Sequence, residues 1–479
     1  MQPVSTCDPA RPLVWRHLYR EAELYKAALR VYTKPLFQWR KALHTSTDGR
    51  TLYDLAARGL RGLEALDRSL RDETFSFRPS VGLKYNFNGK RRTLYIPPWE
   101  ERIVDLLLYR LLNRRLHHWF SPHSYAYRDR ALSLDQCQTR IAQVLRLQCV
   151  PLHIVKRDIT DYFASVNHEL LLRKLEQLVP RGDYLFQLLQ QRVRFAYQDE
   201  EGAHEAVVGI PFGCASACLF ANIYLTELDR AIGQISSVSY FRYSDDILLI
   251  SSSNEKAAEA AKRLEHMLND LRLTTKLSHQ ADLVLSSRAE TDGRFAGAGE
   301  FRHLGLLFRS GGAVALSRDK QRKIQNLFRF AFRRRRRRWR NIVDRVERAR
   351  TLAAIAAEVV EKGVRNVAIL DYYLKHVSEE EQLRMLDLWL AEEVLSLVFG
   401  GHKKGHFAKI SFAELRGMGL PSLVHRRRSI LAGRIESPFF IWRQQKTRRA
   451  FKGTVARLRP LTQGMAFSPL PEAAASKCP

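Results

Sequence analysis

Three aspartates, in two separate stretches of the sequence, have the residue types and setting of a metal-dependent site. Asp245 and Asp246 stand side by side in YFRYSDDILLIS, between two runs of strand-forming residues, which predicts that they lie at the tip of a tight hairpin. Asp158 ends an apolar strand in KRDITDYFASV, far earlier in the chain. Carboxylates repel one another and resist burial, so three of them at one point need cations to hold them there.

Such a cluster would suit nucleotidyl transfer. Carboxylate oxygens are ligands that Mg²⁺ prefers, and Mg²⁺ also takes oxygens from phosphates. Two such ions about 4 Å apart activate a 3′-hydroxyl and stabilise a leaving pyrophosphate. Taken alone, an Asp-Asp pair is equally typical of a solvated turn, because Asp is a common turn residue.

Surrounding elements must position the strand over 150–157, which runs into Asp158, and the hairpin around Asp245. Apolar spacing and turn residues predict most of these elements. In chain order they are helices within 15–70, a hairpin over 81–97 that turns at Asn88-Gly89, a long helix over about 99–120, helical stretches before and after the glycine-rich GIPFGCASACLFANIYL, an amphipathic helix over 255–272 and short strands over 273–308.

The composition changes after Ser310-Gly311-Gly312. SRDKQRKIQNLFRFAFRRRRRRWRN predicts a strongly basic helix from Lys320 to Arg340, with arginines all round it. More helices are expected after it, interrupted by the basic loop GGHKKGHFAKI. We therefore expect five parts: an N-terminal helical region of 1–80, a core of 81–310, a basic helix region of 311–345, a helical C-terminal domain of 346–460 and a disordered tail of 461–479.

The charge of the chain favours a polyanionic partner. Among 479 residues there are 79 Lys and Arg against 50 Asp and Glu, a net charge of +29, which indicates nucleic acid before an anionic membrane. No run of about 18 uncharged apolar residues and no signal-peptide core occurs, so we expect no membrane partner. The six cysteines lack paired metal spacing, which predicts reduced thiols and a cytoplasmic protein.

Six motifs follow one another between about residues 70 and 310: GKRRTLYIPPWEERIVDLLL, SPHSYAYRDR, DITDYFASVNH, GIPFGCASACLFANIYL, YSDD and FRHLGLLF. In this order they resemble the fingers segment, the Ser-Tyr-Gly-Phe-Arg stretch, the first aspartate motif, the glycine-rich motif, the paired-aspartate motif and the primer-grip strand of bacterial reverse transcriptases. That family includes group II intron, retron, diversity-generating and phage-defence enzymes. The resemblance implies an α+β right-hand polymerase with helical fingers, an antiparallel-sheet palm, a basic helical thumb and a helical C-terminal extension.

The resemblance also implies roles for the aspartates and for nearby residues. Asp158 and Asp245 would bind two Mg²⁺ ions, with Mn²⁺ as a substitute, and Asp246 would assist the catalytic geometry. Phe163, five positions after Asp158, matches an aromatic gate against a ribose 2′-hydroxyl, although a core aromatic is the alternative. Arg92, with Lys90 or Arg91, would meet the incoming triphosphate unless this hairpin is only solvated.

Other positions carry over from the glycine-rich motif and its surroundings. Gly209, Pro211 and Gly213 would let the backbone approach the nascent base pair. Arg128 would help to hold template or nucleotide. Asn222 would order the region through hydrogen bonds or act as a cap.

Three departures from the family pattern affect these roles. Phe212 stands where many relatives have Gln, which puts the usual nucleotide contact, and so template use, in doubt. Ala217 replaces a common Pro. The position of the family's later lysine, a candidate proton donor to pyrophosphate, stays open between Lys276 and His279.

The basic residues of the C-terminal third are expected to bind nucleic acid through phosphates, with a solvated face or a nuclear-type signal as the alternative. No zinc-spaced or nuclease-like cluster is found there, so a structured RNA is the favoured partner. The residues concerned are Arg333, Arg334, Arg335, Arg336, Arg337, Arg338, Lys403 and Lys404.

The function expected from the sequence is RNA-directed DNA synthesis from deoxynucleotides on a bound noncoding RNA, in phage defence. The divergent glycine-rich motif and the extra helical domain resemble the "unknown group" of defence reverse transcriptases, some of which form homo-oligomers or work with a partner protein. One alternative is a template-independent or protein-primed DNA polymerase of the abortive-infection type. The other is a catalytically idle RNA-binding or splicing scaffold, which would not need three adjacent carboxylates.

Overall fold

A five-stranded sheet, in the order β6-β7-β3-β8-β9, forms the centre of the computed structural model. β3 pairs antiparallel with both β7 and β8, and β9 joins β8 in parallel. The structure describes residues 12–33, 45–57, 59–87, 90–128, 132–147, 151–286, 290–361 and 367–435. The strands of this palm sheet are β3 (Leu152–Asp158), β6 (Val238–Tyr243), β7 (Asp246–Ser251), β8 (Ala281–Leu285) and β9 (Ala296–Ala298).

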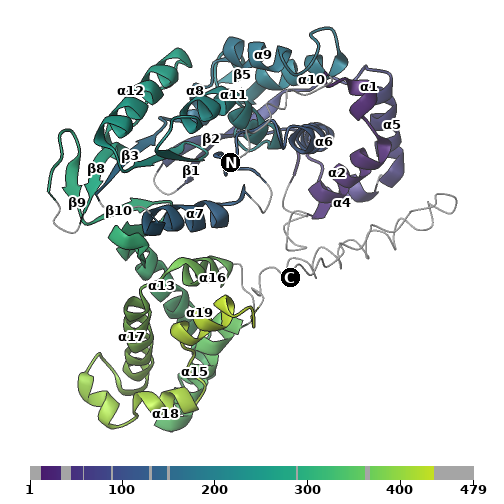
Figure 1. Ribbon diagram of the computed structural model, residues 1–479. Coiled ribbons are helices and arrows are strands. Elements are labelled where there is room, and N and C mark those ends of the chain that lie inside the picture. The colour runs from purple at the N-terminus through teal and green to yellow at the C-terminus, as the bar shows by residue number, and fades with distance from the viewer. Residues whose placement is uncertain are drawn as a thin grey trace.

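Helices cover both faces of the palm sheet, and this explains why β3 is buried almost throughout (Figure 1). Successive residues of a strand point to opposite faces. Val155 accordingly packs into the core formed with α11 and α12, whereas its neighbour Ile154 packs into the core formed with α7. The helices of the palm are α7 (Leu134–Leu147), α8 (Tyr162–Ser165), α9 (His168–Glu176), α10 (Tyr184–Val193), α11 (Ala215–Gly233) and α12 (Asn254–Asp270), with a short 3₁₀ turn η2 (Leu277–His279).

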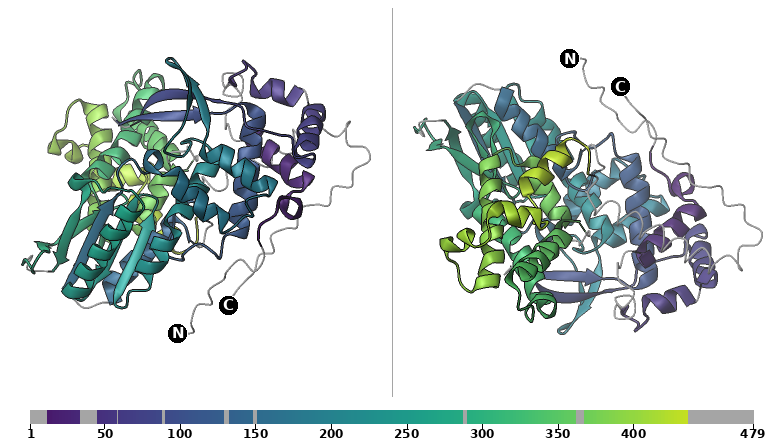
Figure 2. Two further views of the ribbon diagram at one scale, coloured as in Figure 1. Left: turned by 90° about the horizontal axis from the view of Figure 1, so that it is seen from above. Right: turned by 90° about the horizontal axis from the view of Figure 1, so that it is seen from below.

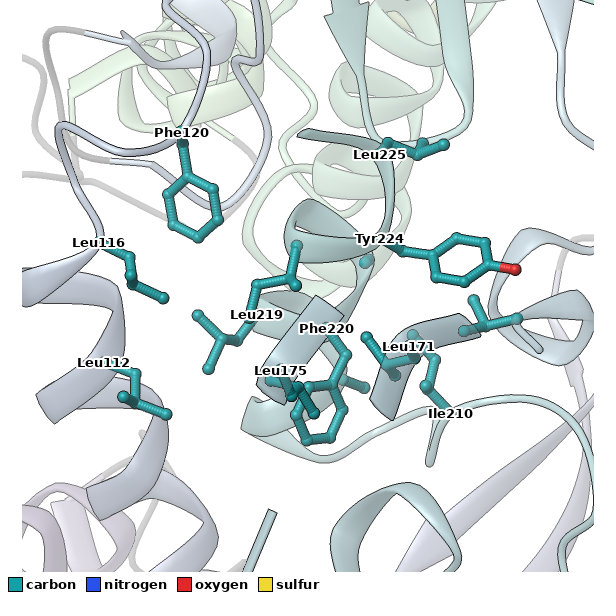
Figure 3. Packing of buried hydrophobic residues seen from close by; sticks show 14 of the residues in the cluster. Leu112, Leu116, Phe120, Leu171, Leu175, Ile210, Leu219, Phe220, Tyr224 and Leu225 are labelled. Carbon is teal, nitrogen blue, oxygen red and sulfur yellow. The ribbon is translucent and has the colours of Figure 1, made fainter. Parts of the chain in front are cut away.

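The first core extends from the palm into the N-terminal helices. Its centre is α11, whose apolar side chains meet those of α9 and of the long helix α6 (Figure 3). Phe220 and Tyr224 are fully buried there, and Phe120, just after α6, is 3% exposed. The helices on this side are α1 (Trp15–Leu18), α2 (Glu21–Thr33), α4 (Leu52–Ala57), α5 (Gly59–Arg71) and α6 (Trp99–Arg115).

A second sheet, in the order β2-β1-β4-β5, carries the hairpin that the sequence predicted over 81–97. β1 and β2 pair antiparallel as expected, and the Asn88-Gly89 turn itself lies outside the described residues. The sequence analysis did not foresee β4 and β5, a hairpin that adds to β1 through a short parallel pairing. These strands are β1 (Ser80–Phe87), β2 (Lys90–Ile96), β4 (Ala196–Asp199) and β5 (Gly202–Glu205).

A small three-stranded sheet and a bundle of helices complete the described chain (Figures 1 and 2). Their apolar side chains continue the second core, which runs from Ile141 of α7 through Phe308 and Phe328 to Leu352 and Leu390. The elements are β10 (Glu300–His303), β11 (Leu306–Arg309), η3 (Ser310–Gly312), β12 (Val314–Leu316), α13 (Arg318–Arg334), α14 (Arg336–Trp339), α15 (Arg345–Glu361), α16 (Val367–His376), α17 (Glu380–Phe399), η4 (Lys404–Ala408), α18 (Phe412–Gly417) and α19 (Leu423–Leu431).

This bundle differs from the sequence expectation in one respect. The prediction of a single basic helix from Lys320 to Arg340 was wrong, because α13 ends at Arg334 and the short α14 follows. The expected division at 345, between a basic thumb helix and a separate C-terminal domain, stays a prediction. The helices α13, α15 and α17 share a core. The expected tail of 461–479 lies outside the described residues. Among the described helices, none has both the length and the apolar character needed to cross a bilayer.

Candidate active site

The two aspartate stretches meet at one end of the β3–β7 pair. Asp158 is the last residue of β3 and lies directly opposite Asp246, the first residue of β7. Residues directly opposite in an antiparallel pair have their side chains on the same face. Asp245 precedes Asp246 in the turn, and its carbonyl accepts a hydrogen bond from the Ile159 amide at 3.0 Å. The structure therefore brings the three predicted carboxylates to one hairpin tip.

The turn that carries Asp245 is a two-residue connection between β6 and β7. Its first residue, Ser244, has φ +60°, a backbone conformation in keeping with the primed turns favoured in two-residue hairpins. Two contacts hold it: the Tyr127 hydroxyl lies 3.2 Å from Ser244 Oγ, and Arg242 Nη1 donates to the Ser244 carbonyl at 3.1 Å. Contacts to its side chain and to its carbonyl thus hold Ser244 in the left-handed conformation, and this fixes the position of Asp245.

Arg242 belongs to a buried network behind the hairpin that the sequence analysis missed. Its guanidinium donates to both carboxylate oxygens of Asp229 at 2.6 Å, and the two side chains are 0% and 1% exposed. Arg242 also donates to Ser124 Oγ at 2.8 Å, and Tyr240 donates to Asp229 at 2.7 Å. A buried charge needs a partner of this kind. The only sequence signal was an arginine inside a strand that is otherwise uncharged.

Asn222 joins the same network from α11. Its amide nitrogen donates to the Ala126 carbonyl at 2.9 Å, and its oxygen accepts from Ser124 Oγ at 3.3 Å. Of the two roles the sequence allowed for Asn222, hydrogen bonding between segments is the one the structure supports.

The pKa of Asp245 and the ion pair of Asp158 show that the aspartate site favours nearby positive charge. Burial raises the pKa of the Asp245 carboxyl, and the negative charge of Asp158 raises it further, against the opposing effects of Lys276 and Arg92. Lys276 forms an ion pair with the Asp158 carboxylate through Nζ, and its backbone amide donates to the Asp158 carbonyl at 2.8 Å. An ammonium group therefore already lies against one of the three carboxylates.

We tested whether these side chains fit divalent cations. Among the described residues, no three Asp, Glu, His or Cys side chains converge closely enough to hold a metal ion by themselves. Mg²⁺ rarely needs such a cage, because it keeps waters and takes substrate phosphates beside one or two carboxylates. Asp158, Asp245 and Asp246 supply hard oxygen donors of that kind, so the donor set fits Mg²⁺ that arrives with a nucleotide.

The predicted nucleotide residues gather beside the hairpin. The Arg92 guanidinium lies over the Phe212 ring, 5.4 Å from its centroid, and its charge reaches Asp245. Phe212 packs edge-on against Phe163 with ring centroids 5.5 Å apart, and Phe163 in turn meets Tyr127 at 6.3 Å. A cation and a wall of aromatic rings therefore lie beside the hairpin that carries the carboxylates, an arrangement suited to a triphosphate and a sugar.

The glycine-rich segment packs closely against neighbouring parts of the protein, and its predicted approach to a nascent base pair stays a prediction. Gly213 has φ +103°, and a Cβ added there would collide with the Leu94 side chain of β2. Gly209 has φ +89°, and its amide donates to the Val166 carbonyl at 2.8 Å. Both positions need glycine, for conformation and for space.

The end of this segment is held by Asp105, which the sequence analysis also missed. This acid of α6 is 2% exposed and accepts from the Ala215 amide at 2.6 Å and from the Ser216 hydroxyl. Arg192 pairs with it at 3.0 Å. A carboxylate at a helix N-terminus is favourable, so Asp105 anchors the start of α11.

Two further residues, Arg128 and Lys90, were predicted to contact template or nucleotide. Arg128 donates to the carbonyls of His117 at 2.6 Å and Ser121 at 3.0 Å and lies over the Phe120 ring, so its visible role is to hold this loop. Lys90 opens β2 opposite Phe87 in the register. Contacts of Arg128 and Lys90 with substrate stay predictions.

The predicted RNA-binding residues of the C-terminal third lie elsewhere. Arg333 and Arg334 end α13, whereas Arg336, Arg337 and Arg338 form α14, and all five are exposed. Lys403 and Lys404 are exposed around η4. None of these residues contributes to the aspartate site as the structure describes it.

The class of the fold follows from four features. They are a mainly antiparallel palm sheet with carboxylates at a hairpin tip, helices on both of its faces, a separate hairpin sheet and a basic helical unit. The fold is that of a right-hand nucleic-acid polymerase. The family profile described as "Reverse transcriptase (RNA-dependent DNA polymerase)" matches residues 84–286. This part of the chain is therefore similar to the reverse transcriptase family, in agreement with the motifs.

Curated relatives match the same part of the chain. The group II intron-encoded protein LtrA of Lactococcus lactis subsp. cremoris is 23% identical over 260 residues, 54% of this chain and 41% of that protein. Protein YkfC of Escherichia coli (strain K12) is 23% identical over 241 residues, 41% of this chain and 61% of that protein. This chain therefore covers less than two thirds of either relative. Among solved structures, apo telomerase from Candida tropicalis gives a TM-score of 0.41 at 10% identity, over 80% of this chain and 67% of that one.

Proposed function

We propose that this chain is an RNA-directed DNA polymerase whose catalytic residues are Asp158, Asp245 and Asp246. The observation that carries the proposal is the meeting of these carboxylates at the β3–β7 tip beside Arg92 and Phe163. A solvated turn would need neither the cation nor the aromatic wall. The match of residues 84–286 to the reverse transcriptase family supports the same chemistry.

Each residue has a distinct task in this proposal. Asp158 and Asp245 would hold two Mg²⁺ ions, which when bound activate a 3′-hydroxyl and offset charge on the leaving pyrophosphate. Arg92 binds phosphate oxygens of the incoming nucleotide, because a guanidinium matches them in charge and geometry. Phe163 excludes a 2′-hydroxyl. Lys276, whose side chain lies against Asp158, serves as the proton donor to pyrophosphate.

The test is incorporation of labelled deoxynucleotides by protein purified with its bound RNA, in Mg²⁺. The variant Asp245→Ala/Asp246→Ala should give no product, while folding normally. A matched control, Glu255→Ala/Glu259→Ala on the exposed side of α12, removes two carboxylates elsewhere and should keep full activity. Product of equal yield from the aspartate variant would refute the proposal, and RNA binding without product from the wild type would favour an idle RNA-binding scaffold.

For the template, we propose a dedicated noncoding RNA held by the protein, in a phage-defence role. The support is the resemblance of the divergent glycine-rich motif and of the extra helical unit to defence reverse transcriptases. Sequencing the products tests it, because a template-directed product is complementary to the bound RNA. A phage challenge of cells carrying the wild type or the aspartate variant tests the defence role.

A second candidate is template-independent or protein-primed DNA synthesis. The observation in its favour is Phe212, whose ring lies between Arg92 and Phe163 where relatives place an amide side chain. An apolar ring cannot hydrogen-bond a nucleotide. Products of homopolymeric or random sequence would decide for this candidate, and a Phe212→Gln variant that restores complementarity would show which residue causes the difference.

A further inference from the structure

The run of six arginines is bent, not helical throughout. α13 ends at Arg334, and Arg335 has φ −102° and ψ +23°, outside the helical range, before the four-residue α14. Trp339 folds back so that its indole nitrogen donates to the Phe332 carbonyl at 3.0 Å. Like charges three and four residues apart destabilise a helix, which gives a physical reason for a break inside this run.

The bend separates arginines that anchor the structure from arginines that do not. Arg335 and Arg338 both pair with Glu358 of α15, at 2.8 and 3.0 Å, and Arg329 pairs with Glu393 of α17 at 3.2 Å. These ion pairs hold α13, α14 and the residue between them against the helices α15 and α17. Within the described chain, no ion pair with an acid is found for the remaining ones: Arg333, Arg334, Arg336, Arg337 and Arg340.

The five unpaired arginines border one hollow. It has a volume of about 910 Å³, and its lining consists of residues 333–338, Arg340 and Asn341. A straight helix would have pointed these side chains in all directions, whereas the bend gathers them around one space. We call this hollow, with its five unpaired arginines, the arginine hollow.

The positive charge of the arginine hollow favours the binding of a polyanion. Guanidinium groups around one space repel one another, and physiological salt, with a Debye length of about 8 Å, screens this repulsion only in part. Each guanidinium offers a planar fork of donors that matches phosphate oxygens. Five such groups around one space fit several phosphates at once.

The hollow is also remote from the palm. α13 starts beside β12 and the 17 residues to Arg334 rise roughly 24 Å at 1.5 Å per residue. Nucleic acid held at the aspartates must therefore extend well beyond the primer terminus, or fold back, to reach it. In folded RNA, phosphates of two strands converge across the deep and narrow major groove of an A-form stem.

We propose that the arginine hollow is a binding site for a folded RNA stem, which anchors the partner RNA at a distance from the catalytic site. The inference rests on the proposed function in one respect: that the partner of this polymerase is RNA. The site itself requires no nucleotide, metal or catalysis.

The test compares three proteins in a salt titration of binding to a labelled RNA hairpin, with a single-stranded RNA of equal length as the second probe. The first is the wild type, and the second carries glutamine at Arg333, Arg334, Arg336, Arg337 and Arg340. The third is a control that loses the same charge on the outer surface of the palm and fingers, with glutamine at Arg68, Arg173, Arg181, Lys262 and Arg263. No nucleotides are present, so failure of the polymerase proposal cannot affect the result.

We expect the hollow variant to bind the hairpin at least about tenfold more weakly at 0.15 M salt. Its slope of log affinity against log salt should be shallower by roughly 3.5 to 4.5, because each lost phosphate contact removes about 0.7 to 0.9. The control should keep the wild-type slope, and the single strand should lose less affinity than the hairpin. The inference would be overturned if the hollow variant and the control lost equal affinity for the hairpin, or if the hollow variant lost equal affinity for both probes.

Folding is checked separately. Removing like charges should leave the thermal midpoint of the hollow variant unchanged or higher. The smaller variant Arg336→Gln/Arg337→Gln/Arg340→Gln, which leaves α13 intact, should lower the slope by roughly 2 to 3. The inference would also be refuted if this folded variant kept the wild-type slope of log affinity against log salt, or if the hollow bound phosphatidylserine vesicles in preference to RNA.

Discussion

The buried pair Arg242–Asp229 gives the sharpest prediction about how the aspartate hairpin is held. The perturbation is Arg242→Met, which keeps an unbranched apolar stem and removes the charge of the side chain. It deletes two hydrogen bonds of 2.6 Å to Asp229, one of 2.8 Å to Ser124 and one of 3.1 Å to the Ser244 carbonyl. Asp229, 1% exposed, would then be a buried carboxylate with one remaining donor, Tyr240.

The size of the effect follows from that burial. Removing one partner of a buried ion pair costs about 3–5 kcal/mol, because the other charge is left uncompensated. Against a total stability of about 5–15 kcal/mol this is a large fraction. Replacing both partners by apolar residues, in Asp229→Leu/Arg242→Met, removes the uncompensated charge and should cost much less than the sum of the two single variants. We expect a coupling free energy of about 3 kcal/mol.

The assay is urea unfolding of the wild type, both single variants and the double variant, with hydrogen exchange of peptides over 238–251 to localise the loss. Arg350→Met, which removes an exposed pair with Glu347, serves as the control and should barely change the unfolding midpoint. The Ser244 turn should exchange faster in Arg242→Met, and polymerase activity should fall with it. A cost below about 1 kcal/mol for Arg242→Met, or additive single and double variants, would refute the reasoning.

Three further predictions concern the site and its support. Phe163→Val should reduce discrimination against ribonucleotides by roughly 10- to 200-fold in kcat/KM, and unchanged discrimination would leave Phe163 as a packing residue. Gly213→Ala should destabilise the protein by about 1–3 kcal/mol, because its φ is +103° and the new Cβ meets Leu94, whereas Gly182→Ala, with open space, should not. The His376 imidazole and Lys375 lower the pKa of Asp135 to about 2, so this carboxylate stabilises the folded state above the unfolded pKa of about 3.9, and the benefit is lost as the pH falls towards 2. Asp135→Asn should therefore lower the thermal midpoint at pH 7 but much less at pH 3, and an equal loss at both pH values would contradict this.

The aspartate hairpin could be predicted because its signals are local. Alternating apolar residues and a two-residue turn specify β6 and β7, and the strand ending at Asp158 supplies the third carboxylate. The pairing of Asp158 with Asp246 was not local, yet it followed from motif order in a family with known architecture. Phe163, Phe212 and Arg92 gather beside that tip in the structure, although their contact with a nucleotide stays a prediction.

What the sequence did not indicate depends on contacts between distant segments. The β4–β5 hairpin is short and partly polar, and only its parallel pairing with β1 makes it part of a sheet. In the sequence, Arg242 and Asp105 cannot be distinguished from exposed charged residues. Only the folded structure shows that both are buried and form ion pairs, Arg242 with Asp229 and Asp105 with Arg192. The break at Arg335 lies among arginines, which are good helix formers, and it results from repulsion along the run and from anchoring to Glu358.

The edge of β12 is completed by residues that are synthesised much later. The Val314 amide donates to Ser378 Oγ at 2.8 Å, 64 positions further on, and Gln382 accepts from the Leu316 amide at 2.6 Å and donates to its carbonyl at 3.0 Å. An open strand edge can pair with another chain. During translation, at about 5–20 residues per second, this edge would stay uncovered for several seconds after it leaves the ribosome. A chain stalled or cleaved before Ser378 would therefore expose a site for aggregation or chaperone binding that the complete bundle conceals.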